Sequence, residues 1–133
     1  MKPLNGIKVI DLTHMLAGPY AGMVVADLGA EVVKIEPLVT GEMTRGLLKT
    51  DPNYSYKEFG AYFLTLNRNK KSVSLDLKSE IGLEIFYQLV KSADVVLNNF
   101  SAGVVKKLKI DFETLNTINP KIITCSITGF GET

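Results

Sequence analysis

Residues 6–36 read GIKVIDLTHMLAGPYAGMVVADLGAEVVKIE, and this stretch decides the fold. Residues 6–14 have the largely apolar character of a buried strand, and residues 31–36 predict a second strand. A loop over 15–19 and a helix over about 19–28 connect them. The only histidine of the chain, His14, therefore lies just beyond the carboxyl end of the first strand. Because ligands of open α/β sheets bind at that edge, the sequence places the site there.

The alternation of strand and helix continues along the chain. Further strands are expected over the Val- and Ile-rich segments 73–77, 94–97 and 122–127. Strands of this kind separated by amphipathic helices predict an α/β fold with right-handed crossovers. The expected architecture is an open, mainly parallel, Rossmann-like sheet with helices on both faces.

Helix starts are predicted from capping residues. Ser55 and Glu58 have the form of a capping box, and Ser79 and Asp111 precede two further apolar patterns. A short helix is expected over 102–108, and a polar, basic turn over 67–71. The side chains expected to face inward from these helices are Phe59, Tyr62, Phe63, Leu66, Ile81, Ile85, Phe86, Leu89, Val90, Phe112, Leu115 and Ile118.

Composition narrows the class of protein. The chain has 133 residues, of which 46% are hydrophobic and 22% are charged, values typical of one globular domain. A net charge of +1 makes no general case for a nucleic-acid or membrane partner. The single cysteine, Cys125, excludes an internal disulfide and a multi-thiolate zinc site, and we expect it to act as a small buried hydrophobe. We expect a cytoplasmic protein without a metal.

The site lacks the common nucleotide-binding signatures. Neither the G-x-G-x-x-G fingerprint nor a Walker A loop is present, although Glu36 ends the second strand where dinucleotide-binding proteins have an acidic residue. We expect Glu36 to cap a loop or to pair with Lys34 or Arg45 instead. Gly18 and Gly22 either bring the helix start close to an anion or only allow close packing.

Basic residues recur near the ends of the predicted strands. Such residues usually form solvated surfaces, but here three separate strand ends are followed by polar or basic groups. A ligand with several phosphates and a long neutral arm would fit this pattern. The basic residues are Lys78, Lys106 and Lys107 after strands, and Arg45, Arg68, Lys70 and Lys71 in expected loops.

A series of short motifs occurs in order along the chain. The motifs are GIKVIDLTH (6–14), AGP (17–19), LGAEVVKIE (28–36), GEMTR (41–45), NRNKKS (67–72), LDLK (75–78), ADV (93–95), NF (99–100) and TGFG (128–131). Together they resemble the amino-terminal region of class III CoA-transferases, the group of formyl-CoA transferases, carnitine CoA-transferases and α-methylacyl-CoA racemases. The resemblance covers residues 1–133, so we expect them to form the CoA-binding part of a larger domain and an incomplete version of the family fold.

The resemblance implies a CoA thioester as ligand. In this family the loop after the first strand, the segment that ends the third strand and the Asn-Phe loop after the fourth strand surround the coenzyme. The implied contacts in this chain are His14, Leu16, Ala17, Leu75, Asp76, Leu77, Lys78, Asn99, Phe100, Ser101 and Lys107. Formyl-CoA transferases have an arginine where this chain has Pro37, so that contact is not implied here.

The same resemblance implies that the reactive groups lie elsewhere. In the transferases an aspartate nucleophile located after the counterpart of Gly131 forms covalent acyl intermediates, and the racemases likewise have their His and Asp downstream. Asp11 and Asp76 occupy positions that do not match that nucleophile. We therefore expect no catalytic residue in the chain and no transferase activity from it alone.

Three interpretations follow. The chain is the amino-terminal region of a CoA-transferase that moves CoA between carboxylic acids through an acyl-aspartate, or a fragment of an α-methylacyl-CoA racemase. Alternatively, it is a non-catalytic acyl-CoA-binding or structural module. The GEMTRG string (41–46) favours the transferase. An open sheet edge predicts a homo-oligomer or association with the remainder of a full-length enzyme.

Overall fold

The structure is a computed structural model that describes residues 1–131. Its centre is a five-stranded sheet with the order β5-β2-β1-β6-β7, and every neighbouring pair in it is parallel. The predicted fold class is confirmed. The strands of the sheet are β1 (Lys8–Asp11), β2 (Glu31–Glu36), β5 (Lys70–Ser74), β6 (Val95–Asn98) and β7 (Ile123–Ser126).

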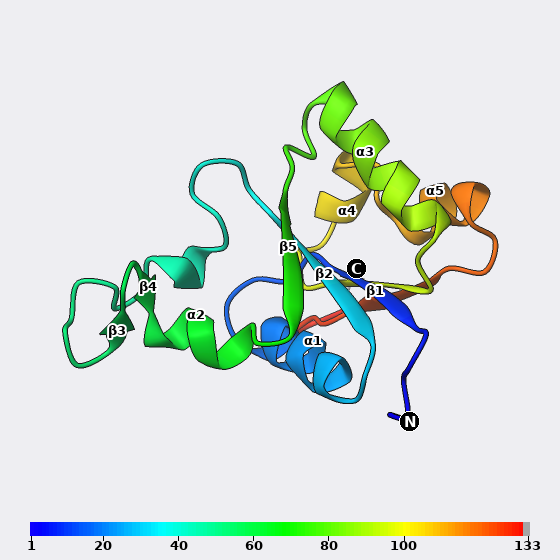
Figure 1. The fold of residues 1–133 in the computed structure, drawn as a ribbon. Helices are drawn as coiled ribbons and strands as arrows, with labels where there is room; N and C mark the ends of the chain where they lie inside the picture. The colour runs from blue at the N-terminus through cyan, green and yellow to red at the C-terminus, as the bar shows by residue number, and fades with distance from the viewer. Residues whose placement is uncertain (132–133) are drawn as a thin grey trace.

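Helices cover both faces of this sheet, as Figure 1 shows. One face carries α1, and the opposite face carries α3, α4 and α5. A smaller unit of α2, the 3₁₀ helix η1 and a β3–β4 hairpin projects beyond the edge formed by β5. The bounds are α1 (Ala17–Asp27), η1 (Met43–Arg45), β3 (Ser55–Tyr56), β4 (Phe59–Gly60), α2 (Ala61–Leu66), α3 (Glu80–Lys91), α4 (Val104–Lys107) and α5 (Phe112–Ile118).

Each face of the sheet has its own apolar core, because successive side chains of a strand point to opposite faces. Val9 of β1 packs with Ala26 and Ala30 on the α1 side. Its neighbour Ile10 packs with Phe86 and other residues on the α3 side. This alternation fixes the register of β1 and brings its end, with Asp11, to the middle of the carboxyl edge.

Two of the predicted caps are confirmed. The Ser79 Oγ accepts a hydrogen bond from the Gly82 N–H at 3.0 Å, and Asp111 accepts one from the Thr114 N–H at 3.2 Å. The third prediction is wrong, since Ser55 belongs to the β3–β4 hairpin and α2 begins only after Gly60. The Ser55 hydroxyl donates to the Asp51 carbonyl instead.

Other differences concern the sheet edge and the helix surfaces. Lys70 and Lys71 belong to β5 and not to a turn, so that strand begins earlier than predicted. Cys125 is exposed because β7 is an edge strand. The expected inward faces are right for Phe86, Val90 and Leu115, whereas the residues that prove to be exposed are Ile81, Ile85 and Phe112.

Candidate functional site

A cleft of about 420 Å³ opens at the carboxyl edge of the sheet, the edge at which the sequence places the site. This volume is in the range of small-molecule sites. We call it the edge cleft, and its lining consists of Leu12, His14, Ile35, Glu36, Pro37, Leu38, Leu75, Asp76, Leu77, Lys78, Phe100 and Leu108.

Three chain segments converge on the edge cleft. His14 follows β1, residues 75–78 follow β5, and Phe100 follows β6. The rings of His14 and Phe100 lie 5.8 Å apart at an interplanar angle of 50°, so they form a tilted aromatic pair at the wall. Leu75 is buried and Leu77 is half-buried, while Asp76 and Lys78 are exposed. An apolar floor with a charged rim results.

The remaining sequence-predicted contacts lie outside this lining. Leu16 and Ala17 are exposed at the start of α1, and Lys107 is exposed on α4. Ser101 lines a separate hollow of about 130 Å³ that shares Phe100 with the edge cleft. Asn99 is half-buried, and its side-chain amide is hydrogen-bonded to the backbone of His14.

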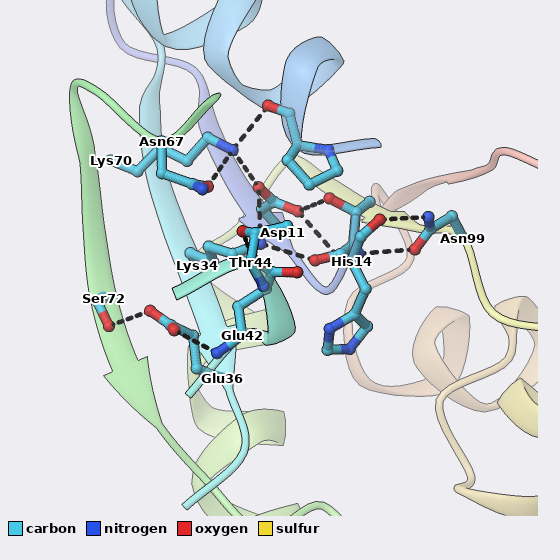
Figure 2. A network of polar contacts seen from close by, with 12 residues as sticks. Asp11, His14, Lys34, Glu36, Glu42, Thr44, Asn67, Lys70, Ser72 and Asn99 are labelled. Atoms are coloured by element: carbon cyan, nitrogen blue, oxygen red, sulfur yellow. Dashed lines mark hydrogen bonds and ion pairs between the residues drawn. The ribbon is translucent and has the colours of Figure 1, made fainter. Parts of the chain in front are cut away.

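Side chains hold the backbone of the loop after β1, as Figure 2 shows. The Asp11 carboxylate accepts from the Thr13 N–H, and the Lys34 ammonium donates to the Thr13 carbonyl at 2.7 Å. Asn99 accepts from the His14 N–H and donates to the His14 carbonyl, both at 2.8 Å. Five consecutive polar backbone groups, ending with the Met15 N–H, are thus satisfied by side chains.

A buried ion cluster lies behind this loop. The Asp11 carboxylate is 2.8 Å from the Lys70 ammonium and 3.8 Å from the Lys34 ammonium, and all three side chains are at most 2% exposed. Lys70 also donates to the Pro19 carbonyl and to the Asn67 side chain. Burial lowers the pKa of Lys70, and the Asp11 carboxylate opposes that shift. Buried charges require such pairing.

A second set of contacts surrounds Glu36 at the end of β2. Arg45 donates to both of its carboxylate oxygens, at 2.5 and 2.7 Å, and the Ser72 hydroxyl donates at 2.6 Å. Burial tends to raise the pKa of Glu36, but these donors and the Glu42 N–H outweigh it and lower the pKa to about 2. The predicted pairing of Glu36 with Arg45 is confirmed.

His14 itself is half-buried, and the contacts drawn in Figure 2 involve its backbone and not its ring. Burial lowers the pKa of the imidazole, and the nearby Lys34 ammonium lowers it further. Carboxylates of Glu42, Asp11 and Glu36 act in the opposite direction. At neutral pH the ring is therefore neutral, and it presents an uncharged polar group to the edge cleft.

Most of the basic residues singled out in the sequence are already paired. Arg68 binds Asp27 and Lys71 binds Glu31, in addition to the pairs of Arg45 and Lys70. These four cations are therefore paired with carboxylates, and they do not line the edge cleft. Lys78 is the basic residue that lines the edge cleft.

Sequence reasoning missed part of the site. Pro37 and Leu38 lie on the exposed loop after β2, and Leu108 comes from the end of α4. The position of Pro37 and Leu38 directly after a strand was the available signal. Glu42, which is fully buried and supports the site, had no signal beyond its place in the GEMTR string.

Two structural observations concern other kinds of site. Within residues 1–131, no group of three or more His, Cys, Asp or Glu side chains is arranged to hold a metal ion. Over the same residues, no helix combines the length and the apolar character that a bilayer crossing requires.

An open parallel sheet with helices on both faces and a cleft at its carboxyl edge defines an open α/β protein, a class that binds its ligands at that edge. The profile of CoA-transferase family III matches residues 4–133, and the chain belongs to that family. A formyl-CoA:oxalate CoA-transferase of Afipia carboxidovorans is 42% identical over 130 residues, which are 98% of this chain and 30% of the relative. The succinyl-CoA:glutarate CoA-transferase of Mus musculus is 42% identical over 133 residues, or 100% of this chain and 30% of the relative.

Solved structures agree with this assignment. A CAIB/BAIF family protein from Brucella suis superimposes with a TM-score of 0.90 at 44% identity, covering 99% of this chain and 35% of that one. The chain thus spans about a third of the length of that structure and 30% of the curated relatives named above. Its fold is that of the matching part of the family.

Proposed function

We propose that residues 1–133 form the CoA-binding part of a CoA-transferase, with a CoA thioester bound along the edge cleft. The observation that carries this proposal is the convergence of His14, residues 75–78 and Phe100 on one cleft of about 420 Å³. The apolar floor suits a neutral pantetheine arm, and Lys78 at the rim suits a phosphate. Leu16, Ala17, Asn99, Ser101 and Lys107 are the proposed outer contacts.

The chemistry of transfer requires a carboxylate nucleophile that can form a covalent acyl intermediate. The buried carboxylates described above do not suit that role. Asp11 is held by Lys70, and Glu36 by Arg45 and Ser72, so each is committed to an ion pair. We therefore propose that an aspartate outside residues 1–133 supplies the nucleophile, and that the chain alone does not exchange CoA.

Transfer rather than racemisation is favoured by the relatives, since two that match nearly all of the chain are named as CoA-transferases. Assay of the complete enzyme with a range of dicarboxylic acids would identify the acyl donor and the acyl acceptor. Detectable CoA exchange between two acids by the purified chain would contradict the proposal that the nucleophile lies outside residues 1–133.

Binding is tested by calorimetric titration of the chain with CoA. We expect saturable binding, weakened by Lys78→Met about two- to fivefold, because an exposed charge contact contributes up to about 1 kcal/mol. Lys121→Met is the matched control, since Lys121 is also exposed but lies outside the cleft lining. Absence of binding at millimolar CoA, or an equal effect of both changes, would count against the edge cleft.

A further inference from the structure

The geometry points to Glu42 as a positioning residue, which clamps the loop after β1 and thereby sets the place of His14 in the edge cleft. Affinity for a CoA thioester then depends on Glu42, although Glu42 is not part of the cleft lining. The affinity part of this inference rests on the proposed function, whereas the clamp itself does not.

The Glu42 carboxylate is fully buried and saturated with donors. One oxygen accepts from the Met15 N–H at 2.9 Å. The other accepts from the Thr44 N–H at 3.1 Å and from the Thr44 hydroxyl. The Glu42 N–H in turn donates to the Glu36 carboxylate at 2.7 Å, so the residue is tied to the end of β2 as well. Charge-assisted bonds of this kind are strong and directional.

The residue that Glu42 holds has an unfavourable backbone conformation. Met15 has a φ of 67°, in the left-handed region that L-residues other than Asn, Asp and Gly seldom adopt. Such a conformation persists where the surroundings over-determine it. Asn99 binds the His14 N–H and the His14 carbonyl, and Glu42 binds the Met15 N–H, so both polar groups of the peptide unit between His14 and Met15 are held by side chains. Removal of either contact lets the loop relax and moves His14 relative to Phe100.

The alternative, that Glu42 itself acts on a ligand, conflicts with its surroundings. A carboxylate that is 0% exposed and bound by three donors is not accessible to a substrate. An anionic thioester would also repel a bare carboxylate. The arrangement fits support of a binding loop from behind, which is how functional groups are held within narrow geometric limits.

The test compares Glu42→Gln with Glu84→Gln, an exposed position on α3 that serves as the matched control. Glutamine keeps the size of Glu42 but offers one oxygen, so the Met15 and Thr44 donors can no longer both be satisfied. We expect CoA affinity to fall roughly tenfold, as for the loss of a charge-assisted hydrogen bond. The control variant should bind as the wild type does.

A second readout needs no ligand. The charges that face His14 are Lys34, Glu42, Asp11 and Glu36 from within, with Asp76 and Lys78 at the cleft rim. Because the Glu42 carboxylate raises the pKa of His14, NMR titration should show a lower imidazole pKa in Glu42→Gln. The Met15 amide should also lose its protection against hydrogen exchange. Unchanged His14 titration and Met15 protection in a folded variant would overturn the clamp.

Thr44→Val provides a milder variant if Glu42→Gln does not fold, because it removes one donor to Glu42 and keeps the charge. We expect a smaller loss of affinity and reduced Met15 protection, and wild-type behaviour in both would overturn the inference. A wild-type chain that does not bind CoA refutes the proposed function alone, since the NMR readouts still decide whether Glu42 holds the loop.

Discussion

Two loops that border the edge cleft differ in how their backbones are held. In the loop after β1, the buried side chains of Asp11, Lys34 and Glu42 and the half-buried Asn99 bind each polar backbone group from the Thr13 N–H to the Met15 N–H. In the loop after β2, residues 37–40 are all exposed, and the backbone hydrogen bonds are local ones, such as that from the Gly41 N–H to the Pro37 carbonyl. One wall of the cleft is fixed by the rest of the molecule, while the other is held only by its own turn.

The backbone angles sharpen this contrast. Met15 and Val39 both have a φ of 67°, yet Met15 is held by Glu42 whereas Val39 is fully exposed. Segments with few buried contacts open locally at low free energy, and segments tied to a core do not. We infer that the loop after β1 sets the orientation of a ligand and that the loop after β2 adapts to it.

The largest expected effect comes from breaking the support of the fixed loop. Asp11→Asn removes the carboxylate shared by Lys34 and Lys70 and leaves two buried ammonium groups without a counter-charge. Breaking a buried ion pair in this way typically costs about 3–5 kcal/mol. Urea denaturation followed by circular dichroism measures the free energy of unfolding.

Glu31→Gln is the matched control for Asp11→Asn, because the Glu31–Lys71 pair is exposed on both sides. Exposed pairs contribute little, so this variant should unfold close to the wild type. Equal destabilisation by the two changes would show that the ion cluster behind the loop after β1 does not support the fold.

The next effect is a loss of stability in acid that depends on Glu36. The pKa of Glu36 is about 2 in the folded chain, against an ordinary value of 4.5. Between these values the unfolded chain binds more protons than the folded chain, so the stabilisation is complete above about pH 4.5 and is lost as pH falls toward 2. Glu36→Gln should remove this part of the pH dependence.

Denaturation curves of wild type and Glu36→Gln at pH 7, 4 and 3 measure the difference. The wild type should lose more stability than the variant between pH 4 and 3, because the wild type alone has the carboxylate that Arg45 and Ser72 stabilise. An equal loss of stability in the wild type and the variant between pH 4 and 3 would mean that the contacts of the Glu36 carboxylate, including the one with Ser72 of β5, do not stabilise the fold.

The main sheet could be predicted because its strands are short apolar runs bounded by clear helix signals. That logic also places the site, since parallel strands end at one edge and carry His14, Leu75 and Phe100 there. Between the second and third predicted strands the pattern is weak. Ser55 and Glu58 match a capping box by spacing alone, but the backbone there pairs as a hairpin.

The buried polar cluster could not be predicted, because its partners are far apart in the chain. Lys34 and Lys70 look like solvated charges in a local window, and only the strand order brings them beside Asp11. The same holds for Glu42, whose contact with Met15 spans 27 positions. Local periodicity thus predicts which face of an element is apolar, but not which charged side chains a tertiary fold will bury.

The smallest expected effect lies in the exposed loop. Val39→Asn replaces a β-branched residue at a φ of 67° by one that tolerates the left-handed region, and no described side chain loses a hydrogen bond. Since that conformation costs an ordinary residue about 1–2 kcal/mol, we expect a stability gain of up to about 1 kcal/mol. Asparagine is preferred to glycine here because glycine would enlarge the entropy of the unfolded chain.

Denaturation at pH 7 measures the gain, and CoA affinity should stay as in the wild type because the Val39 side chain lies outside the cleft lining. A loss of stability would instead show that the loop after β2 is held as firmly as the loop after β1.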